Sequence, residues 1–523
     1  MSNMSQVVLA AEVEVPKLDY AAMAPILILF GAACIGVLIE AFASRRTRHL
    51  TQVALSAVAL IAALGTVIRY ANSGRRELTA DVALAVDGPA LFLQGTLAVL
   101  GLLAVLLMAE RTIEPGGPFV AQAAITVGSE ADRRQGRQPG GTEVFPLTLF
   151  ALAGMMMFVS ANDLLTMFVA LEVFSLPLYL LCALARRRRL VSQEAALKYF
   201  LLGAFASAFF LFGMALLYGF AGTVTFAGIH EATLGATTSQ LLLYTGLALV
   251  AVGLLFKIAA VPFHVWTPDV YQGAPTSVTA FMAACTKVAA FGGLLRVLFV
   301  AFDRSRLDIE PVLGTVAILT MLVGAILAVT QTDIKRLLAY SSIANAGYLL
   351  VGALAFSADG LSASMFYLVA YGFAVLAAFG IVTLVRDEEG EATHLSRWAG
   401  LGRRSPLVAG VFTFLLLAFA GIPLTSGFTS KFAVFAAALG GGTSWQVALV
   451  IAGVVTSMVL AFPYLRVVVM MWLSEPSDQT PSVAIPGAFT SAALMVGVLA
   501  TLLLGVFPSA VLDLAESAAQ FVR

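Results

Sequence analysis

The stretch GLALVAVGLLFKIAAVPFHVWTPDVYQGAP, residues 246–275, contains one lysine within an apolar run and a proline five residues after it. With the residues that precede it, the apolar run reaches the roughly 20 residues that a helix needs to cross a bilayer. Proline removes a helical hydrogen bond and frees a carbonyl, so we expect the helix to break near Pro262. In a membrane such a break is tolerated only where protein or water satisfies the freed backbone groups. The stretch therefore predicts a membrane helix that is interrupted beside a buried lysine, Lys257.

The composition of the whole chain is that of a protein dissolved in lipid. Its 523 residues are 60% hydrophobic and only 11% charged, whereas a soluble domain carries roughly 25% charged residues. The net charge is zero, so electrostatics gives no reason to expect a nucleic-acid partner. The first 19 residues are acidic and lack a basic segment, so we expect no cleaved signal peptide. The cysteines lie far apart and match no metal or disulfide spacing: Cys34, Cys182 and Cys285.

The hydropathy pattern predicts an all-α polytopic membrane protein with about 14 transmembrane helices. The apolar stretches lie at about 20–43, 50–70, 90–109, 145–160, 162–185, 196–221, 239–260, 274–301, 311–330, 335–356, 361–385, 405–440, 445–473 and 486–508. The twelfth is too long for one straight crossing and contains Gly421, Pro423 and Gly427, so we interpret it as a second broken helix.

The basic residues of the loops predict the orientation. Most of the loop arginines fall on one side, including the run 186–189, and the positive-inside rule places that side in the cytoplasm. An even number of spans then leaves both termini on the outer side. The order lysine–proline in the seventh span and proline–lysine in the twelfth is typical of two inverted repeats, as in many transporters. The predicted organisation is 1–109, an N-terminal three-helix segment; 110–144, a polar cytoplasmic loop; 145–301 and 302–473, two half-channel repeats; and 474–523, a C-terminal helix.

Titratable residues inside the spans are the candidate functional groups. Five of the six lysines lie in spans, while most arginines lie in loops. Arginine keeps its proton in any realistic environment, whereas a buried lysine can release one. A charge at the centre of a bilayer costs roughly 2.5–3.5 kcal/mol, so these positions are expected to be functional. The lysines within spans are Lys198, Lys257, Lys287, Lys335 and Lys431, of which Lys257, Lys287 and Lys431 are expected to lie deepest.

One acid, Glu172, falls in the middle of a span. A lysine partner would keep it charged, and loosening such a Glu–Lys pair would let the lysine release its proton. The alternative is that the lysines and Glu172 only bridge helices in structural ion pairs. Glu194 and Lys198 are four residues apart and can pair on one helix face.

Two further positions stay open at this stage. Lys335 and Arg336 begin the tenth span on the predicted cytoplasmic side, where they fit a topology signal and a channel role equally well. His264 lies beside the predicted break and can relay protons near neutral pH, but a capping or loop role is just as plausible.

Long stretches of the chain resemble a known family. They are LEVFSLPLYLLCAL (171–184), EAALKYFLLGAFASAFFLFGMALLYG (194–219), KIAAVPFHVWTPDVYQGAPTSVTAFMAACTKVAAF (257–291), QTDIKRLLAYSSIANAGYLLVG (331–352) and AGIPLTSGFTSKF (420–432). The chain resembles the antiporter-like membrane subunits of the proton-pumping NADH–quinone oxidoreductase, respiratory complex I, a family shared with multisubunit cation/proton antiporters. The sequence after Glu172 and the sequence at 194–200 are similar to those of the subunit N branch. The end soon after the fourteenth span differs from subunit L, and lysine at 431 differs from subunit M.

The resemblance implies a role for each candidate residue. It places the pumping elements at Glu172, Lys257, Lys287 and Lys431, and further family lysines at Lys198 and Lys335. It implies that this chain binds no cofactor, and that other subunits of the complex hold NADH, FMN, the iron–sulfur clusters and quinone. The implied partners are the other membrane-arm subunits and the lipid bilayer, in a bacterial inner (plasma) membrane. The loop at 110–144 departs from the compact connection usual in the family.

Three other functions remain compatible with the residues alone. A subunit of a multisubunit sodium/proton antiporter would share the same ion-path residues. A structural spacer within the complex would carry the same helices with an idle channel, although the deep lysines argue against it. A transporter of an organic solute is the least favoured, because no substrate-specific polar cluster stands out.

Overall fold

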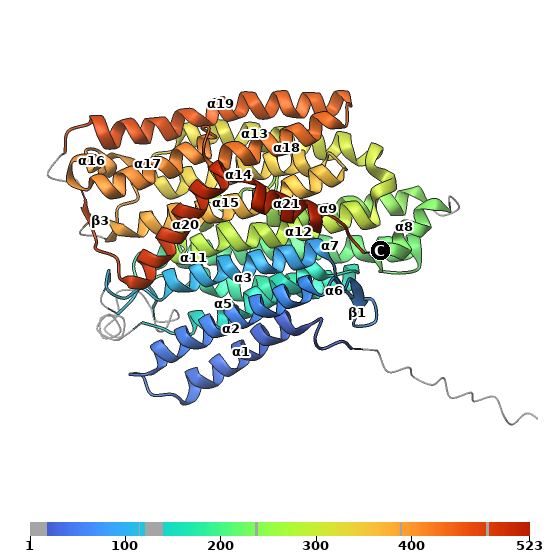
Figure 1. Ribbon diagram of the computed structural model, residues 1–523, viewed down its shortest axis with the longest axis horizontal. Coiled ribbons are helices and arrows are strands. Elements are labelled where there is room, and N and C mark those ends of the chain that lie inside the picture. The colour runs from blue at the N-terminus through green and yellow to red at the C-terminus, as the bar shows by residue number, and fades with distance from the viewer. Residues whose placement is uncertain are drawn as a thin grey trace, which may run out of the picture.

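The computed structural model describes residues 18–114, 116–120, 140–235, 239–387, 390–476 and 481–522. Over these residues the chain is a bundle of helices that lie side by side with their axes nearly aligned (Figure 1). Both ends of the described chain lie at the same end of the bundle, on the right in Figure 1, as an even number of crossings requires. Most of the predicted 110–144 loop and the acidic residues 1–17 lie outside the described residues.

The helices of the first part of the chain follow the predicted spans closely. They are α1 (Ala24–Phe42), α2 (Arg48–Asn72), α3 (Gly88–Met108), α5 (Val144–Ser160), α6 (Leu164–Cys182), α7 (Arg189–Ala221), α8 (Phe226–Leu234), α9 (Gln240–Ile258), α10 (Trp266–Gly273), α11 (Thr276–Phe281) and α12 (Lys287–Arg296). Single π-helical turns, Met282–Thr286 and Val297–Ala301, precede and follow α12.

The second part of the chain continues the bundle. Its helices are α13 (Arg306–Thr330), α14 (Ile334–Ala353), α15 (Ala358–Leu384), α16 (Leu401–Arg404), α17 (Pro406–Ala420), α18 (Ser426–Gly440), α19 (Ser444–Leu473), α20 (Ala488–Val506) and α21 (Ser509–Ala518). The described strands are short: β1 (Glu77–Thr79) pairs with β2 (Leu84–Val86), and β3 (Val385–Asp387) lies between β4 (Gly390–Glu391) and β5 (Ser482–Val483).

The all-α polytopic membrane fold predicted from hydropathy is confirmed. Within the described ranges, 11 helices are long and apolar enough to cross a membrane, and two shorter apolar helices, α5 and α17, accompany them. Every one of the predicted apolar stretches contains helix. The number of 14 crossings and the two inverted repeats stay predictions, because helix length and composition alone do not decide them.

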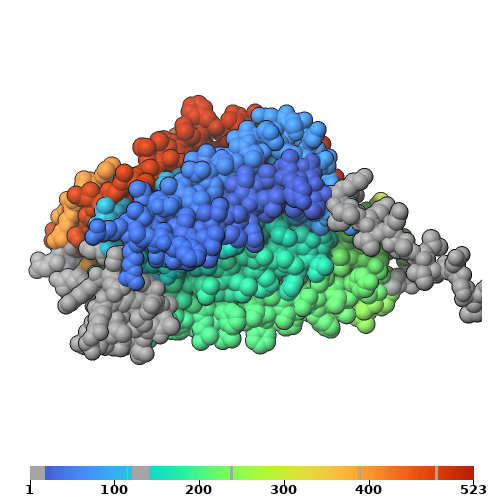
Figure 2. All heavy atoms as spheres, turned by 90° about the horizontal axis from the view of Figure 1, so that it is seen from below, coloured from blue at the N-terminus to red at the C-terminus, as the bar shows by residue number. Residues whose placement is uncertain are grey.

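Burial separates a central pair of helices from the periphery. The segment Thr276–Ala301 and α15 are each 94% buried over their most apolar window, whereas α1 is 28% buried. Figure 2 shows the first helices, in dark blue, on the outside of the bundle. Peripheral apolar side chains therefore face lipid or neighbouring subunits, and the central pair holds the interior of the protein.

Both predicted helix breaks are present. The helix α9 ends at Ile258, and the chain turns through left-handed Ala259 before α10 begins at Trp266. The helix α17 ends at Ala420, and α18 starts only at Ser426. Between them Gly421 has a φ of +84°, a conformation that glycine adopts without a steric penalty. A third irregularity, the π-helical turn before Lys287, has no proline and was not predicted.

A buried ion pair between Asp87 and Arg296 holds the C-terminal segment against the interior. Arg296 donates from Nη1 and Nη2 to the two oxygens of Asp87, at 2.9 and 2.8 Å, and both side chains are fully buried. Asp87 also caps α3 by accepting from the backbone N–H of Ala90. The C-terminal segment closes over the pair, since Phe521 packs on the guanidinium and the N–H of Val522 donates to Asp87.

We expect Asp87→Asn to destabilise the protein strongly. Removing one partner leaves the buried charge of Arg296 uncompensated, and breaking such pairs costs roughly 3–5 kcal/mol. The thermal unfolding midpoint of the purified membrane protein measures the loss. Arg403→Gln is the matched control, because Arg403 and Glu475 form an exposed pair 4.0 Å apart and such pairs contribute little. Equal midpoints for Asp87→Asn and the control would contradict a stabilising role.

Candidate functional site

Lys257 lies in the last turn of α9 with its side chain 3% exposed. Its Nζ donates to Ser175 Oγ of α6 at 2.7 Å. Four aromatic rings surround the same nitrogen, with centroids 5.2–5.7 Å away: Phe174, Tyr179, Tyr199 and Phe256. Ring faces attract a cation, but they offer no lone pair to fix one N–H direction. One hydroxyl and four rings therefore hold Lys257 without a carboxylate in contact.

Glu172 lies on α6 one turn before Ser175, at the edge of the bundle. It is partly exposed and accepts a hydrogen bond from Ser207 Oγ of α7 at 2.5 Å. Among the described residues, no ion pair joins Glu172 to Lys257, so the Glu–Lys pair that the sequence suggested is not formed between these two residues. The reason is geometric: the end of α9 aims Lys257 at Ser175, one helical turn further along α6.

Lys287 follows the π-helical turn of the central segment and is 4% exposed. Its Nζ donates to the carbonyl oxygen of Ser342 and, at 2.7 Å, to the Oγ of the same residue. The ring of Tyr371 lies 5.1 Å from the nitrogen. Single π-helical turns occur frequently at functional sites because they redirect the side chains around them. This turn places Lys287 against α14 and α15, near the centre of the protein.

Lys431 of α18 is held by the break between α17 and α18. Its Nζ donates to the carbonyls of Phe419 and Ala420 at 2.9 and 3.3 Å, and to Ser457 Oγ at 2.9 Å. The last carbonyls of a helix have no intrahelical partner, so the two at the end of α17 are free to accept from a side chain. The tyrosine ring of Tyr348 lies 5.0 Å away. The break thus supplies an acceptor cage that an ammonium group needs when water is excluded.

The break after α9 is satisfied differently. Trp266 Nε1 donates to the carbonyl of Phe256, at 3.0 Å, and Thr320 Oγ1 accepts from the backbone N–H of Val261. The carbonyl of Phe256, which also accepts from the backbone N–H of Ala259, therefore binds an indole and not Lys257. Lys431 has three oxygen acceptors and Lys257 has one, so the two lysines differ in how well the protein replaces their water.

Uncharged polar groups that the sequence analysis missed lie between Lys287 and Lys431. Asn345 of α14 accepts from Tyr367 Oη of α15 at 2.6 Å and donates to the carbonyl of Ser341. Tyr464 of α19 donates to Ser341 Oγ. A cavity of about 10 Å³, the size of roughly one water, adjoins Lys431 and is lined in part by Asn345, Tyr367, Tyr371, Ser426 and Ser430. The polar run at 340–348 within an apolar helix was the available signal.

Lys198 lies at the surface of the bundle and not in its interior. Its side chain is 43% exposed and forms ion pairs of 2.7 Å with Glu194 and with Asp269 of α10. The predicted Glu194–Lys198 pair is present. Asp269 also pairs with Arg336 of α14 at 2.7 Å, so one carboxylate, which the sequence analysis had not singled out, links three helices.

Lys335 is buried, with 2% of its surface exposed, and Nζ donates to the carbonyl of Ala274 at 2.9 Å. It adjoins a polar cavity of about 60 Å³ at the end of the bundle opposite the chain ends, which is also lined by Arg188, Thr276 and Glu391. This burial fits a channel role better than a topology signal, which only needs a charge in water.

His264 lies in the break between α9 and α10 and is half-buried. Among the described residues, no hydrogen bond joins its ring to a lysine. The structure therefore does not bring His264 into the line formed by the other candidates. Over the described ranges, no group of three or more His, Cys, Asp or Glu residues is arranged to hold a metal ion.

The chain is similar to a known protein family over more than half of its length. The family described as "NADH:quinone oxidoreductase/Mrp antiporter, TM" matches residues 161–459. The NADH-quinone oxidoreductase subunit N of Salinispora arenicola is 67% identical over 98% of this chain and 100% of its own. The subunit N of Saccharopolyspora erythraea is 59% identical over 97% of this chain and 99% of its own.

Solved structures with the same fold come from three kinds of complex. A chain of respiratory complex I from Thermus thermophilus, with bound aureothin, superposes with a TM-score of 0.74 at 32% identity, covering 94% of this chain and 99% of that one. A chain of the Mrp complex from Dietzia sp. gives 0.81 at 25% identity, with 95% and 97% coverage. A chain of an archaeal membrane-bound sulfane sulfur reductase gives 0.77 at 25% identity, with 96% and 97% coverage.

Proposed function

The chain belongs to the subunit N family of NADH-quinone oxidoreductase, and from this premise we propose that it translocates protons along a line formed by Glu172 and the buried lysine side chains. It is a membrane-arm subunit of respiratory complex I with an antiporter-like fold. The observation that carries the proposal is the placement of Lys257, Lys287 and Lys431 inside the protein, each bound only to neutral oxygens.

The buried lysines have the properties of proton carriers. None of the three has a carboxylate within ion-pair distance among the described residues, so no fixed negative charge holds their protons. Hydroxyls and carbonyls accept from the protonated amine, and hydroxyls can also donate to the neutral one. A group in such surroundings changes its charge with a small change in local field, which a static structural ion pair would resist.

In this proposal Glu172 responds to a charge change in a neighbouring subunit. It lies beside an apolar stripe of α6 that is about half exposed and includes Leu165, Val169 and Leu176. Such a stripe on a membrane helix faces lipid or another subunit. A charge change at that surface alters the contact of Glu172 with Ser207 and the field at Lys257.

The proton then moves along the line. Lys257 passes its proton toward Lys287, with water or side-chain motion closing the gap, and Lys287 is reloaded through Lys335 from the polar cavity at the cytoplasmic end. Lys431 releases a proton to the outer side. One charge moved against 100 mV requires about 2.3 kcal/mol, which a change of less than two pKa units supplies. The two half-channels correspond to the repeats 145–301 and 302–473.

Redox chemistry takes place elsewhere in this scheme. The chain is a translocase subunit of an oxidoreductase and holds no redox site, while NADH, FMN, iron–sulfur clusters and quinone are bound by other subunits. Its partners are the adjacent membrane-arm subunits and lipid. It resides in the bacterial inner membrane with both termini on the outer side, in agreement with the arginine distribution.

A sodium/proton antiporter function is the second candidate, because the Mrp chain from Dietzia superposes with the TM-score of 0.81. Inverted membrane vesicles separate the two functions. We expect deletion of this chain to abolish NADH-driven acidification, with restoration by the wild type, and we expect no dependence on sodium. Unchanged NADH-driven acidification, together with loss of a sodium-dependent pH response, would instead establish the antiporter function.

A further inference from the structure

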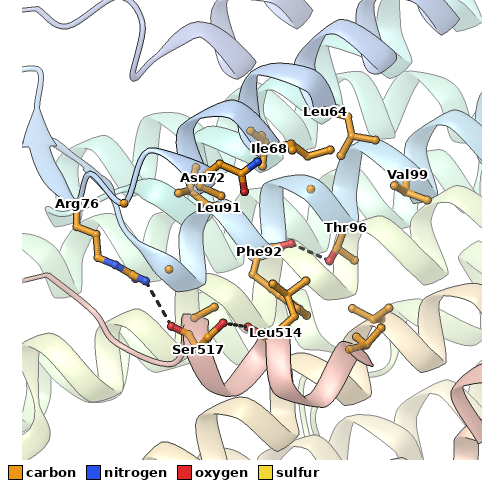
Figure 3. Close-up of a pocket in the computed structure, with 18 of the residues that line it drawn as sticks. Leu64, Ile68, Asn72, Arg76, Leu91, Phe92, Thr96, Val99, Leu514 and Ser517 are labelled. Atoms are coloured by element: carbon orange, nitrogen blue, oxygen red, sulfur yellow. Dashed lines mark hydrogen bonds between the residues drawn. The ribbon is translucent and has the colours of Figure 1, made fainter. Parts of the chain in front are cut away.

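An apolar cavity of about 630 Å³ opens between α2, α3, α15 and α21, away from the lysine line. Figure 3 shows the cavity with most of its lining residues. The residues that form it are spaced three or four apart, so each helix turns one face to the cavity. They include Leu64, Ile68, Phe92, Thr96, Val99 and Leu514.

The cavity is about as deep as one leaflet of a bilayer. Along α3 it extends from Gly88 to Val99, which at 1.5 Å per residue is about 16 Å. Half of the roughly 30 Å hydrocarbon core is about 15 Å. Thr96 does not make the wall polar, because its hydroxyl donates to the carbonyl of Phe92 in its own helix. The cavity thus has the length and the lining that suit an acyl chain.

Two cations stand at one end of this cavity. Arg75 and Arg76 follow α2, are exposed, and line the cavity mouth. Neither forms an ion pair with a carboxylate of the described residues. Arg76 donates to the carbonyl of Ser517 at 3.4 Å, which leaves further N–H donors free. The mouth lies where α3 begins, at the level that lipid headgroups occupy when α3 spans the membrane.

We propose that this cavity binds a phospholipid of the adjacent leaflet, with one acyl chain between α2, α3 and α21 and the phosphate on Arg75 and Arg76. Planar guanidinium groups bind phosphate through paired hydrogen bonds. A neighbouring protein helix fits less well, because the cavity is only about one leaflet long and the cations in its described lining, Arg75 and Arg76, lie at the headgroup level. The lipid would fasten the C-terminal helix α21 to α2 and α3.

Photo-crosslinking of the intact complex tests the proposal. The probes are a phosphatidylglycerol with a diazirine in the middle of one acyl chain and the diacylglycerol that carries the same chain without phosphate. We expect the phosphatidylglycerol to label peptides of α2, α3 and α21. Combined Arg75→Gln and Arg76→Gln should lower that labelling about tenfold or more, because the charge-assisted hydrogen bonds to the phosphate are lost. The diacylglycerol should label weakly and be unaffected.

Gly95→Leu tests the acyl-chain site separately. A Cβ at Gly95 meets only Val67 and Leu64, at 3.6 and 3.9 Å, so the backbone accepts a side chain there, and Gly95 lines the cavity that the added side chain would fill. We expect it to remove labelling by both probes. Gly31→Leu in α1, where a Cβ meets nothing within 4 Å, is the matched control. Combined Arg304→Gln and Arg306→Gln, on exposed arginines outside the cavity, is the control for charge.

Retained NADH oxidation verifies the assembly of each variant. Labelling that survives Gly95→Leu, or that falls equally in the control variants, would overturn the proposal. So would labelling of a neighbouring subunit in place of α2, α3 and α21, because it would mean that protein fills the cavity. Since the test reads lipid contact and not pumping, its failure leaves the proton path untouched, and failure of the proton path leaves this site untouched.

Discussion

Lys257→Ala is expected to reduce NADH-driven acidification of inverted membrane vesicles by at least about tenfold at equal complex content. A proton donor and acceptor in a transfer step typically contributes 10²–10⁴-fold to its rate. Alanine has no amine to replace the Lys257 Nζ that donates to Ser175 Oγ among the aromatic rings. NADH oxidation and blue-native electrophoresis, measured on the same membranes, report the amount of assembled complex.

Lys257→Arg distinguishes the loss of proton release from the loss of positive charge at this position. Arginine keeps a positive charge but does not release its proton, so a proton carrier at this position should fail in both variants. If Lys257→Arg acidifies the vesicles normally, Lys257 acts only as a fixed charge. Normal acidification in Lys257→Ala would remove it from the path altogether.

Lys431→Met is expected to have a comparable effect on acidification and an additional effect on stability. The substitution leaves the carbonyl of Phe419 without its donor at the end of α17 and removes one of the two donors to the carbonyl of Ala420, which keeps Ser457 Oγ. A buried polar group that loses its partner costs about 1–3 kcal/mol. Acidification of vesicles measures the first effect, and the thermal unfolding midpoint of the purified complex measures the second.

Ser457→Ala is the matched control for Lys431→Met. It removes one of the three acceptors of Lys431 and leaves the amine and both carbonyl contacts in place. We expect it to lower acidification modestly and the unfolding midpoint only slightly. An equal loss in Ser457→Ala and Lys431→Met would indicate that local packing, and not the titratable amine, determines activity at this break.

Hydropathy and proline placement predicted most of the fold. Apolar runs of sufficient length locate helices because a single segment in lipid can satisfy its own backbone hydrogen bonds only as a helix. The breaks at Pro262 and Pro423 were predictable because proline cannot continue a helix, and the structure interrupts α9–α10 and α17–α18 at these places. The deep lysines were predictable because burying them carries a free-energy cost.

The rest of the site depends on contacts that carry little signal in the sequence. Ser175, Ser342 and Asn345 are uncharged polar residues in apolar helices, and the sequence does not mark which such residues contact or connect the lysines, as these three do. The π-helical turn before Lys287 changes the hydrogen-bond pattern without a marker residue. Residues far apart in the chain meet at Asp87 and Arg296, and periodicity does not predict such pairing.

The sequence suggested a pair between Glu172 and a lysine, and the structure does not form that pair with Lys257. The charge pattern does not determine where along α6 the end of α9 points. Ser175 takes the position of the expected carboxylate. Lys257 is consequently less firmly bound than an ion-paired lysine, which suits a group that has to exchange its proton.

The most direct test measures protons translocated per NADH oxidised by the purified complex in proteoliposomes, comparing the wild type with Lys287→Met. Methionine fills the space of Lys287 beside Ser342 without a titratable group. A proton path through the buried lysines predicts fewer protons per NADH at the same complex content. An unchanged ratio would contradict proton transfer through Lys287 and with it the line from Lys257 to Lys431.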